Sequence, residues 1–251
     1  MSLRPSSRHA TGRPPLLIVQ TGSTLPAVRA RHGDFPEWFR RGLGWRRDQV
    51  DVVDAAREPL PVAGAYAGVI VTGSPAMVSE RLAWSERTAQ WLVQAIDAGS
   101  AVLGVCYGHQ LLAHALGGRV DDHPRGREVG TVAIERLPDT GDDALFANAP
   151  ACFAAHASHQ QSVLELPPGA VVLARSAHDP HHAVRYAPRA WGLQFHPEFS
   201  VEIMRGYVQA RRPAAGAACP QPCCTDVGCA PTPSARQLLR RFGALVGAGP
   251  G

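Results

Sequence analysis

Residues 101–117 read AVLGVCYGHQLLAHALG, and this stretch decides the fold. It opens with an apolar, strand-like run that ends at Cys106, and apolar residues then recur at helical spacing. Glycines stand two positions before and two positions after Cys106. This pattern is typical of a nucleophile elbow, where a strand turns so sharply into a helix that bulky side chains at those positions would collide. The stretch therefore predicts a strand, a tight turn and a helix in an α/β protein.

Cys106 is expected at the N-terminus of that helix. The partial positive charge of a helix N-terminus favours a thiolate over a thiol, which makes a cysteine reactive. The alternative is a buried structural cysteine at a strand end, which is the commoner role of an isolated cysteine. The stretch alone leaves both interpretations open.

Outward from this stretch, short β-prone runs bounded by Gly or Pro alternate with amphipathic segments, which is the pattern of a parallel sheet with crossover helices. From about residue 130 to residue 194 short strands follow one another with little helix between them, so we expect an antiparallel edge. Ser85 is expected to cap a helix that stops at Gly99. The expected strands are 16–20, 50–53, 69–72, 101–105, 131–134, 170–174, 183–185 and 191–195, and further helices are expected at 201–210 and 234–245.

A second informative stretch, residues 191–199, reads WGLQFHPEF and predicts a strand that ends at His196. Glu198 follows two positions later, and residues two apart in an extended chain face the same way. Pro197 favours that extended conformation at His196. Glu198 can therefore hold one ring nitrogen while the other faces Cys106, so we expect Cys106, His196 and Glu198 to form a catalytic triad.

The segments GVCYGHQ and GLQFHPE together resemble the signature segments of class I glutamine amidotransferases, the triad family that includes the amidotransferase domain of GMP synthase. The likeness covers residues 16–210, and its start, QTGSTLPAVRARHGDFPEWF, is most similar to small stand-alone members without a fused synthetase domain. The resemblance implies a flavodoxin-like α/β fold. Such a fold has an open, mostly parallel central sheet with helices on both faces and an antiparallel edge.

The resemblance also implies an oxyanion hole. One donor would be the backbone amide of Tyr107, and the other would come from Gly73 or Ser74 in the turn TGSP, where serine replaces a glycine often found before the proline. Gln110 matches a position that binds substrate glutamine, and it shares a helix face with Cys106. The alternative for Gln110 is an ordinary polar residue of the first helical turn.

Three further residues are implied near the pocket. Glu128 lies in the segment REVG, which resembles a pocket segment of the family, with an ordinary strand-edge carboxylate as the alternative. Ser158 and His159 resemble a pair that borders the glutamine pocket. Gln161 stands where the family commonly has aspartate, which leaves the fine substrate specificity open.

The implied reaction is acyl transfer from L-glutamine. The Cys106 thiolate attacks the γ-carboxamide, His196 protonates the departing ammonia, and water hydrolyses the glutamyl thioester. No cofactor is expected, and a synthetase or another acceptor enzyme is the implied partner for the ammonia. Two alternatives stay open: a hydrolase of γ-glutamyl peptides or γ-glutamyl amines that uses the same triad, and a catalytically silent subunit that binds a partner.

Composition excludes several other classes of function. All 25 basic residues are arginine, so there is no lysine for a Walker loop or a Schiff base. The arginines are scattered without interleaved aromatic residues, so no nucleic-acid surface is expected. Apolar runs are far shorter than the roughly 20 residues that span a bilayer, and the N-terminus has no apolar signal core. We therefore expect a cytoplasmic protein with no membrane contact.

The chain divides into four expected regions. Residues 1–14 are expected to be a mobile leader and residues 15–212 the amidotransferase domain. Residues 213–233, rich in Pro and Cys, are expected to form an excursion, and residues 234–251 a C-terminal helix and tail that pack on the same domain.

No metal site is expected. The cysteines of the excursion lack the usual spacing of zinc ligands, and the four histidines have neither a helical HxxxH pattern nor a matched carboxylate, so these histidines are expected in loops and on the surface. The residues concerned are Cys219, Cys223, Cys224 and Cys229, and His156, His178, His181 and His182.

Overall fold

The structure is a computed structural model that describes residues 16–211 and 229–247. The expected leader and most of the expected excursion, with Cys219, Cys223 and Cys224, lie outside the described residues. The strands are β1 (Leu16–Gln20), β2 (Val50–Asp54), β3 (Gly68–Val71), β4 (Ala101–Val105), β5 (Arg119–Asp122), β6 (Glu128–Arg136), β7 (Cys152–His159), β8 (Gln161–Glu165), β9 (Val171–Arg175), β10 (Ala183–Ala187) and β11 (Ala190–Leu193). The α-helices are α1 (Pro26–His32), α2 (Phe35–Leu43), α3 (Ala83–Asp97), α4 (Tyr107–Ala115), α5 (Val201–Ala210) and α6 (Pro233–Gly247).

One large sheet organises the molecule. Its nine strands run in the order β2-β1-β3-β4-β11-β10-β9-β6-β7. The pairs from β2 to β11 are parallel, and the pairs from β11 to β7 are antiparallel. The expected mostly parallel sheet with an antiparallel edge is therefore confirmed. A small antiparallel sheet of β5 and β8 lies apart from it.

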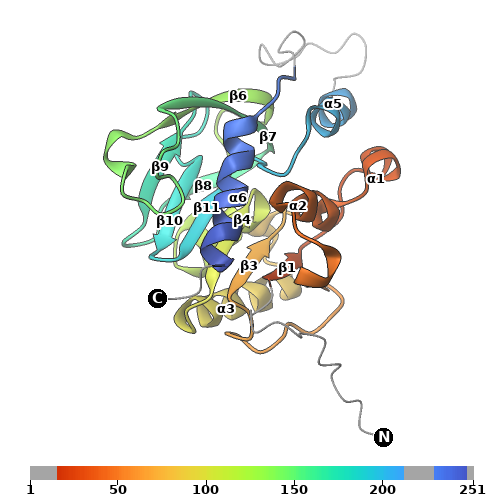
Figure 1. Cartoon of the computed structure of the whole chain (residues 1–251), viewed down its shortest axis with the longest axis vertical. Helices are drawn as coiled ribbons and strands as arrows, with labels where there is room; N and C mark the ends of the chain where they lie inside the picture. Colours follow the sequence, from red (N-terminus) through yellow and green to blue (C-terminus); the bar gives the residue numbers. More distant parts are fainter. Residues whose placement is uncertain (1–15, 212–228, 248–251) are drawn as a thin grey trace, which may run out of the picture.

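Helices cover both faces of the parallel half. Leu16 and Ile18 of β1 belong to the apolar cluster that includes residues of α2 and α6, whereas Leu17 and Val19 belong to the cluster that includes residues of α3 and α4. Figure 1 shows α6 lying along the sheet beside α2. Burial on both faces explains why β1 is apolar at every position up to Gln20 instead of alternating. No helix within 16–211 or 229–247 has the length and apolarity needed to cross a bilayer.

The structure corrects one helix boundary and adds elements that the sequence did not predict. Helix α3 begins at Ala83 after Leu82, so Ser85 is not its cap; the Ser85 hydroxyl instead lies 2.6 Å from the Tyr107 hydroxyl. Strands β5, β7 and β8 were not expected, and neither were α1 and α2; β7 pairs with β6 in the large sheet, and β8 pairs with β5 in the small one. Helix α2 carries a recognisable signal, because Asp34 and Glu37 form a capping box at its start.

The turn between β4 and α4 is as tight as the glycine pattern predicts. A Cβ placed on Gly104 would lie 2.3 Å from the carbonyl oxygen of Gly108, and a Cβ on Gly108 would lie 2.4 Å from the carbonyl oxygen of Val71. Cys106 itself has φ 53° and ψ −103°, a conformation that L-residues with side chains rarely adopt. Close backbone packing on either side therefore holds Cys106 in a strained conformation.

Substitution of Gly108 tests this packing. Gly108→Ala should lower the free energy of unfolding by about 1–3 kcal/mol, since backbone must move to admit the methyl group. Gly141→Ala is the matched control, because Gly141 has φ −63° and open space around its Cα, and its stability should be unchanged or slightly higher. Urea denaturation measures both, and equal midpoints for Gly108→Ala and the wild type would contradict the close approach.

Candidate active site

The candidate site lies where the parallel strands end. Cys106 follows β4, the segment 72–75 follows β3, and His196 comes shortly after β11. Because β11 pairs with β4 and β4 pairs with β3, these three segments leave the sheet side by side. The backbone N–H of Cys106 donates to the carbonyl of Leu193 at 2.7 Å, which ties the first segment to the last. The carboxyl edge of a parallel sheet is the usual place for a ligand site in such folds.

His196 is buried and held on several sides. Its Nδ1 lies 2.7 Å from Oε1 of Glu198, and its backbone N–H donates to the carbonyl of His156 at 2.7 Å. Its ring stacks on Phe199 at 4.0 Å and runs nearly parallel to Phe35 at 6.4 Å. Burial alone would lower the pKa of His196, but the negative charges of Glu198 and Cys106 raise this pKa to about 10. The surroundings of His196 therefore favour its imidazolium form.

The Cys106 thiol is also buried and interacts with the His196 imidazole. Burial by itself would raise the pKa of the thiol, yet the charge and hydrogen bond of His196, followed by the charge of His159, lower the pKa below its usual value. The sulfur also lies 3.8 Å from the carbonyl oxygen of Ser158. The arrangement stabilises a thiolate–imidazolium pair, in which a nucleophile and a proton donor stand side by side.

The turn of residues 72–75 abuts His196. A Cβ on Gly73 would lie 3.2 Å from Cε1 of His196, so the turn approaches the ring as closely as a glycine allows. The Thr21 hydroxyl lies 3.0 Å from the carbonyl oxygen of Gly73, and the Ser74 hydroxyl donates to the carbonyl of Thr21 at 2.7 Å. The Ser74 side chain thus anchors the turn. Tyr107 is the first residue of α4, where a backbone N–H has no acceptor within the helix.

Gln110 lies one turn along α4 from Cys106 and is buried. Its side-chain nitrogen donates to the carbonyl of Gln161 at 2.6 Å and to Oε1 of Gln194 at 3.0 Å. These contacts fix the amide plane. The Gln161 side chain itself turns to Ser79, donating to its hydroxyl at 2.6 Å.

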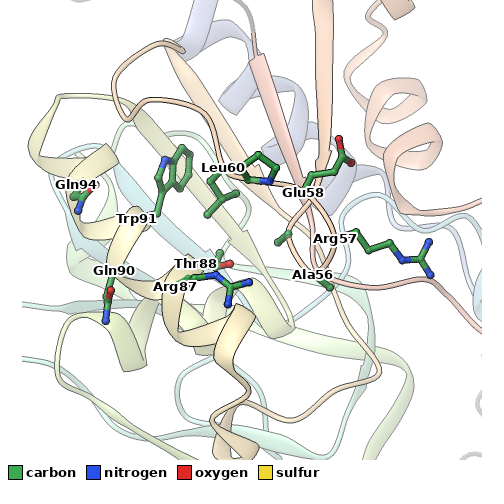
Figure 2. Close-up of a pocket in the computed structure, with 11 residues that line it drawn as sticks. Ala56, Arg57, Glu58, Leu60, Arg87, Thr88, Gln90, Trp91 and Gln94 are labelled. Atoms are coloured by element: carbon green, nitrogen blue, oxygen red, sulfur yellow. The ribbon is translucent and has the colours of Figure 1, made fainter.

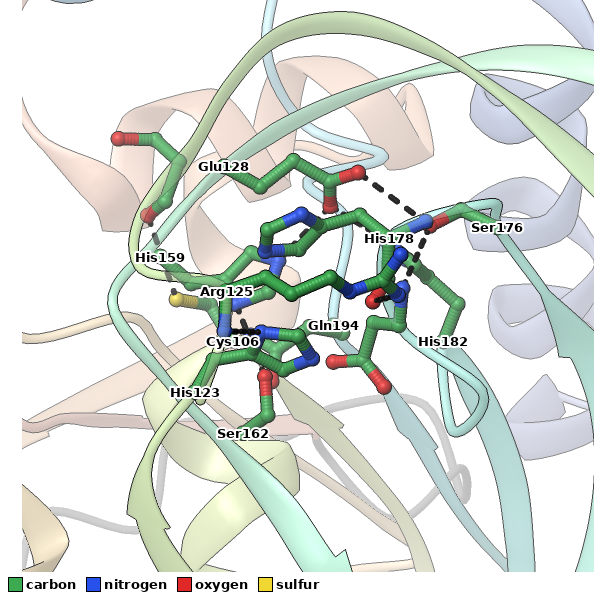
Figure 3. A network of polar contacts seen from close by, with 12 residues as sticks. Cys106, His123, Arg125, Glu128, His159, Ser162, Ser176, His178, His182 and Gln194 are labelled. Carbon is green, nitrogen blue, oxygen red and sulfur yellow. Dashed lines mark hydrogen bonds and ion pairs between the residues drawn. The ribbon is translucent and has the colours of Figure 1, made fainter. Parts of the chain in front are cut away.

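Glu128 joins two buried histidines next to Cys106 (Figure 3). Its Oε2 lies 2.9 Å from Nε2 of His159 and 2.8 Å from Nε2 of His182, and its Oε1 accepts from the Ser176 hydroxyl at 3.2 Å. Burial would raise the pKa of Glu128, but the two histidines hold that pKa well below its usual range.

The contacts of His159 in this network favour its positively charged form. Its Nδ1 lies 3.0 Å from the carbonyl oxygen of Gln161, and its Nε2 faces the Glu128 carboxylate. A carbonyl and a carboxylate are both acceptors, so these two contacts favour a proton on each ring nitrogen; the Ser162 hydroxyl also lies 3.3 Å from Nδ1. The pKa of His159 is accordingly raised, although burial opposes the shift. Beside it, the buried Ser158 hydroxyl has no hydrogen-bond partner among the described residues.

The structure corrects the expected surface position of two histidines. His156 and His182 are completely buried, because His156 lies within β7 and His182 immediately precedes β10. Three ligand atoms, one each from Glu128, His159 and His182, lie within 4.8 Å of one another, a donor set that a metal ion could use. In the structure these atoms satisfy one another by hydrogen bonds. Cys229 is a half-buried free thiol.

Sequence reasoning missed the aromatic support of His196. Phe35 and Phe199 flank the imidazole, and Phe35 also packs edge-on against Trp38 in α2. The sequence signal that could have located Phe35 was the capping box of Asp34 and Glu37. It marks Phe35 as the first residue of a helix.

A separate hollow of about 500 Å³ lies between the segment after β2 and helix α3 (Figure 2). Arg57, Glu58, Arg87 and Trp91 are among its lining residues. None of its lining residues belongs to the Cys106 site, so this hollow is not the place where the reactive pair meets a ligand.

Comparisons with known proteins agree on one family. Residues 33–209 match the family model described as Glutamine amidotransferase class-I. The chain is 45% identical over 131 residues to a glutamine-hydrolyzing GMP synthase of Thermomicrobium roseum, a match that covers 52% of this chain and 23% of that protein. It is 30% identical over 168 residues to one subunit of the glutamine-hydrolyzing GMP synthase of Methanopyrus kandleri, a match that covers 66% of this chain and 85% of that protein.

Solved structures show the same fold. The crystal structure of a glutamine amido transferase from Methylobacillus flagellatus superposes with a TM-score of 0.72 at 22% identity, covering 93% of this chain and 94% of that one. The crystal structure of a protein described as SMU.1228c gives a TM-score of 0.70 at 19% identity, covering 92% of this chain and 98% of that one.

The Glu128 network predicts a pH-dependent contribution to stability. Because the pKa of Glu128 is lowered in the folded protein, its ionised carboxylate stabilises the fold. This stabilisation is fully present at a pH above the ordinary carboxyl pKa of 4.5, and it is lost as the pH falls through the folded pKa. Because the pKa of His159 is raised in the folded protein, its protonated ring also stabilises the fold. This stabilisation is fully present at a pH below the ordinary imidazole pKa of 6.5, and it is lost as the pH rises through the folded pKa. Glu128→Gln should therefore destabilise the protein by about 3 kcal/mol, mostly between these two values.

Urea denaturation from pH 4 to pH 9 measures this difference. Glu135→Gln is the matched control, because Glu135 lies on the same strand but pairs with Arg175 at the surface, and it should leave stability unchanged. A Glu128→Gln effect that is constant across the range would show that these charges contribute nothing to stability.

Proposed function

The chain belongs to the class-I glutamine amidotransferase family, and from this premise we propose that it hydrolyses the side-chain amide of glutamine to glutamate and ammonia. Cys106 is the nucleophile, His196 the acid and base, and Glu198 the residue that orients the imidazole. The observation that carries the proposal is that the buried Cys106 thiol and His196 imidazole interact electrostatically, with Glu198 bonded to Nδ1 of His196 at 2.7 Å. A nucleophile, a base and an orienting acid in this relation are the requirements of covalent acyl transfer.

In the first half-reaction the Cys106 thiolate attacks the γ-carboxamide carbon of glutamine. A C–S bond forms and the carbonyl oxygen becomes an oxyanion. The backbone N–H groups of Tyr107 and of Gly73 or Ser74 stabilise this charge, and loss of one such donor typically costs about 3–4 kcal/mol in the transition state. His196 then gives its proton to the amide nitrogen, the C–N bond breaks, and ammonia leaves.

In the second half-reaction the neutral His196 takes a proton from water. The resulting hydroxide attacks the thioester carbon, the C–S bond breaks, and glutamate leaves while Cys106 returns to the thiolate. His196 is again the imidazolium, so the ion pair is restored for another turnover. Glu198 stabilises the imidazolium throughout and keeps its Nδ1 turned away from the sulfur.

We assign the wall of the glutamine pocket to Gln110, Ser158 and His159. The buried Ser158 hydroxyl has no partner among the residues the structure describes, so it is free to bind the substrate. His159 contributes its positive charge, which favours the thiolate form of Cys106. Glu128 supports the site without binding the substrate, because both of its oxygens accept hydrogen bonds from protein groups. Its carboxylate favours the charged form of His159.

We also propose that a synthetase or another acceptor enzyme receives the ammonia. The relatives reported above are named GMP synthase, one of them as a subunit of that enzyme, and the match covers only 23% of the Thermomicrobium roseum protein. A γ-glutamyl peptide or γ-glutamyl amine is the second candidate substrate, because Gln161 binds Ser79 and Asp122 instead of presenting the aspartate usual in the family.

A glutaminase assay tests the reaction. Wild-type protein should release ammonia from L-glutamine, and Cys106→Ala should release none, because the thioester cannot form. Glu198→Gln should lower kcat by about 10²–10⁴-fold, since an amide cannot stabilise the imidazolium. Glu202→Gln, an exposed acidic residue on α5, is the control and should match the wild type.

The substrate and the silent alternative need separate measurements. A glutamine-like chloroketone should alkylate Cys106 in the wild type and leave His196→Ala unlabelled under the same conditions. Faster turnover of γ-glutamyl amides than of glutamine would assign the chain to the second candidate reaction. Neither labelling nor ammonia release, with and without an added synthetase, would overturn the proposed function.

A further inference from the structure

The loop that carries Glu198 is held by a residue far along the chain. The guanidinium Nη2 of Arg236 donates to the carbonyl oxygen of Phe199 at 2.8 Å and to that of Glu198 at 3.3 Å. Arg236 lies on α6, beyond the end of the matched family region 33–209. One nitrogen therefore binds the backbone of two consecutive residues, and each of these residues supports His196.

Those two residues constrain the imidazole in different ways. Glu198 fixes its Nδ1 by a hydrogen bond of 2.7 Å, and Phe199 fixes its plane by stacking at 4.0 Å. A shift of the backbone at 198–199 would disturb both contacts together. Placement matters here, because a displacement of about 1 Å in a catalytic group can cost 10²-fold in rate.

From these contacts, and on the basis of the proposed function, we propose that Arg236 is a positioning residue for the triad, through which α6 holds the loop of Glu198 and Phe199 in the geometry that His196 needs. Helix α6 thus takes part in the active site although none of its side chains need touch the substrate. The inference adds to the triad a component that the matched family region does not contain.

Helix α6 is anchored independently of this guanidinium. Its apolar face is buried, with Leu239 against α2 and Phe242 against Trp191 of β11. Removal of the Arg236 head group should therefore leave the helix docked. The stem of Arg236 also packs near Gly42 of α2, so a long unbranched side chain at this position keeps that contact.

The same helix offers matched controls. Arg240 donates through Nε to the carbonyl of Gly42 at 3.3 Å, and Arg241 donates through Nη1 to the carbonyl of Leu145 at 2.9 Å. Both are arginines of α6 that bind a backbone carbonyl, as Arg236 does, but neither carbonyl belongs to the triad loop. A difference between Arg236 and these two residues isolates the contact with residues 198–199.

The experiment compares Arg236→Met with Arg240→Met and Arg241→Met in the full chain. For glutamine hydrolysis, Arg236→Met should lower kcat by about 10–100-fold with KM unchanged, whereas both controls should keep the wild-type kcat. In a Glu198→Gln background, Arg236→Met should add little further loss, since the residue acts through that loop. Equal losses in the controls, or fully additive losses, would overturn the proposal.

A second readout does not depend on glutamine. Iodoacetamide alkylation of Cys106, followed by mass spectrometry across pH, reports the thiolate, whose pKa depends on His196, His159 and Glu198. His156, which also faces His196, is present in every variant. The midpoint of alkylation should move to higher pH in Arg236→Met and stay unchanged in the controls.

The two readouts separate the two claims. A shifted midpoint without glutamine turnover in any variant would keep the role of Arg236 and reject the proposed substrate. Unchanged kcat and unchanged midpoint in folded Arg236→Met would reject the role of Arg236. If circular dichroism shows that Arg236→Met does not fold, Arg236→Lys replaces it, because lysine keeps the stem and charge but has a shorter reach. A lysine variant with the wild-type kcat and midpoint would then overturn the proposal.

Discussion

The contact between the Cys106 sulfur and the His196 imidazole is the constraint on which the rest of the site depends. The two residues are distant in sequence, and they meet because β4 and β11 are neighbouring parallel strands that end at the same edge of the sheet. Gly104 and Gly108 allow the turn that places Cys106 at this edge, and Gly73 allows the preceding turn to approach the ring. At each of these glycines the backbone or the imidazole ring comes too close for a side chain. The geometry of the active site therefore depends on the tight packing of the strand ends.

The site concentrates charge in a buried place, and its ion pairs explain how that is tolerated. Two acidic groups, the Cys106 thiol and the Glu198 carboxyl, interact with the His196 imidazole, and a second imidazole, His159, is held beside them by Glu128. An unpaired charge at this depth would be costly, whereas an opposite charge beside it offsets part of the desolvation cost. The same interaction lowers the pKa of the Cys106 thiol and raises the pKa of the His196 imidazole, so it favours the ionised form of each. Chemical reactivity and tolerance of burial thus have a common electrostatic cause.

The sequence predicted the parallel half of the fold well, because its signals are local. The apolar runs at residues 16–20 and 101–105 and the helix at 201–210 have the predicted bounds, and GxCxG marks the turn at Cys106. It failed where position depends on tertiary contacts: strands β7 and β8, which pair with β6 and β5, were not expected, and His156 and His182 were expected on the surface. Neither histidine has a local pattern that reveals burial, since His182 is buried only because Glu128, far away in sequence, supplies a carboxylate for its Nε2. Arg236 was equally invisible, because its partners are backbone carbonyls, which no sequence pattern identifies.

The protonation state of His196 in solution tests the ion pair most directly. Nitrogen-15 NMR of histidine-labelled protein can follow the His196 ring across pH, with the resonance assigned by its loss in His196→Gln. The account predicts that His196 stays an imidazolium well above neutral pH, with a pKa near 10, and that Cys106→Ser lowers this pKa because the thiolate is gone. A His196 that titrates near 6.5, the ordinary imidazole value, in both proteins would contradict the existence of the pair.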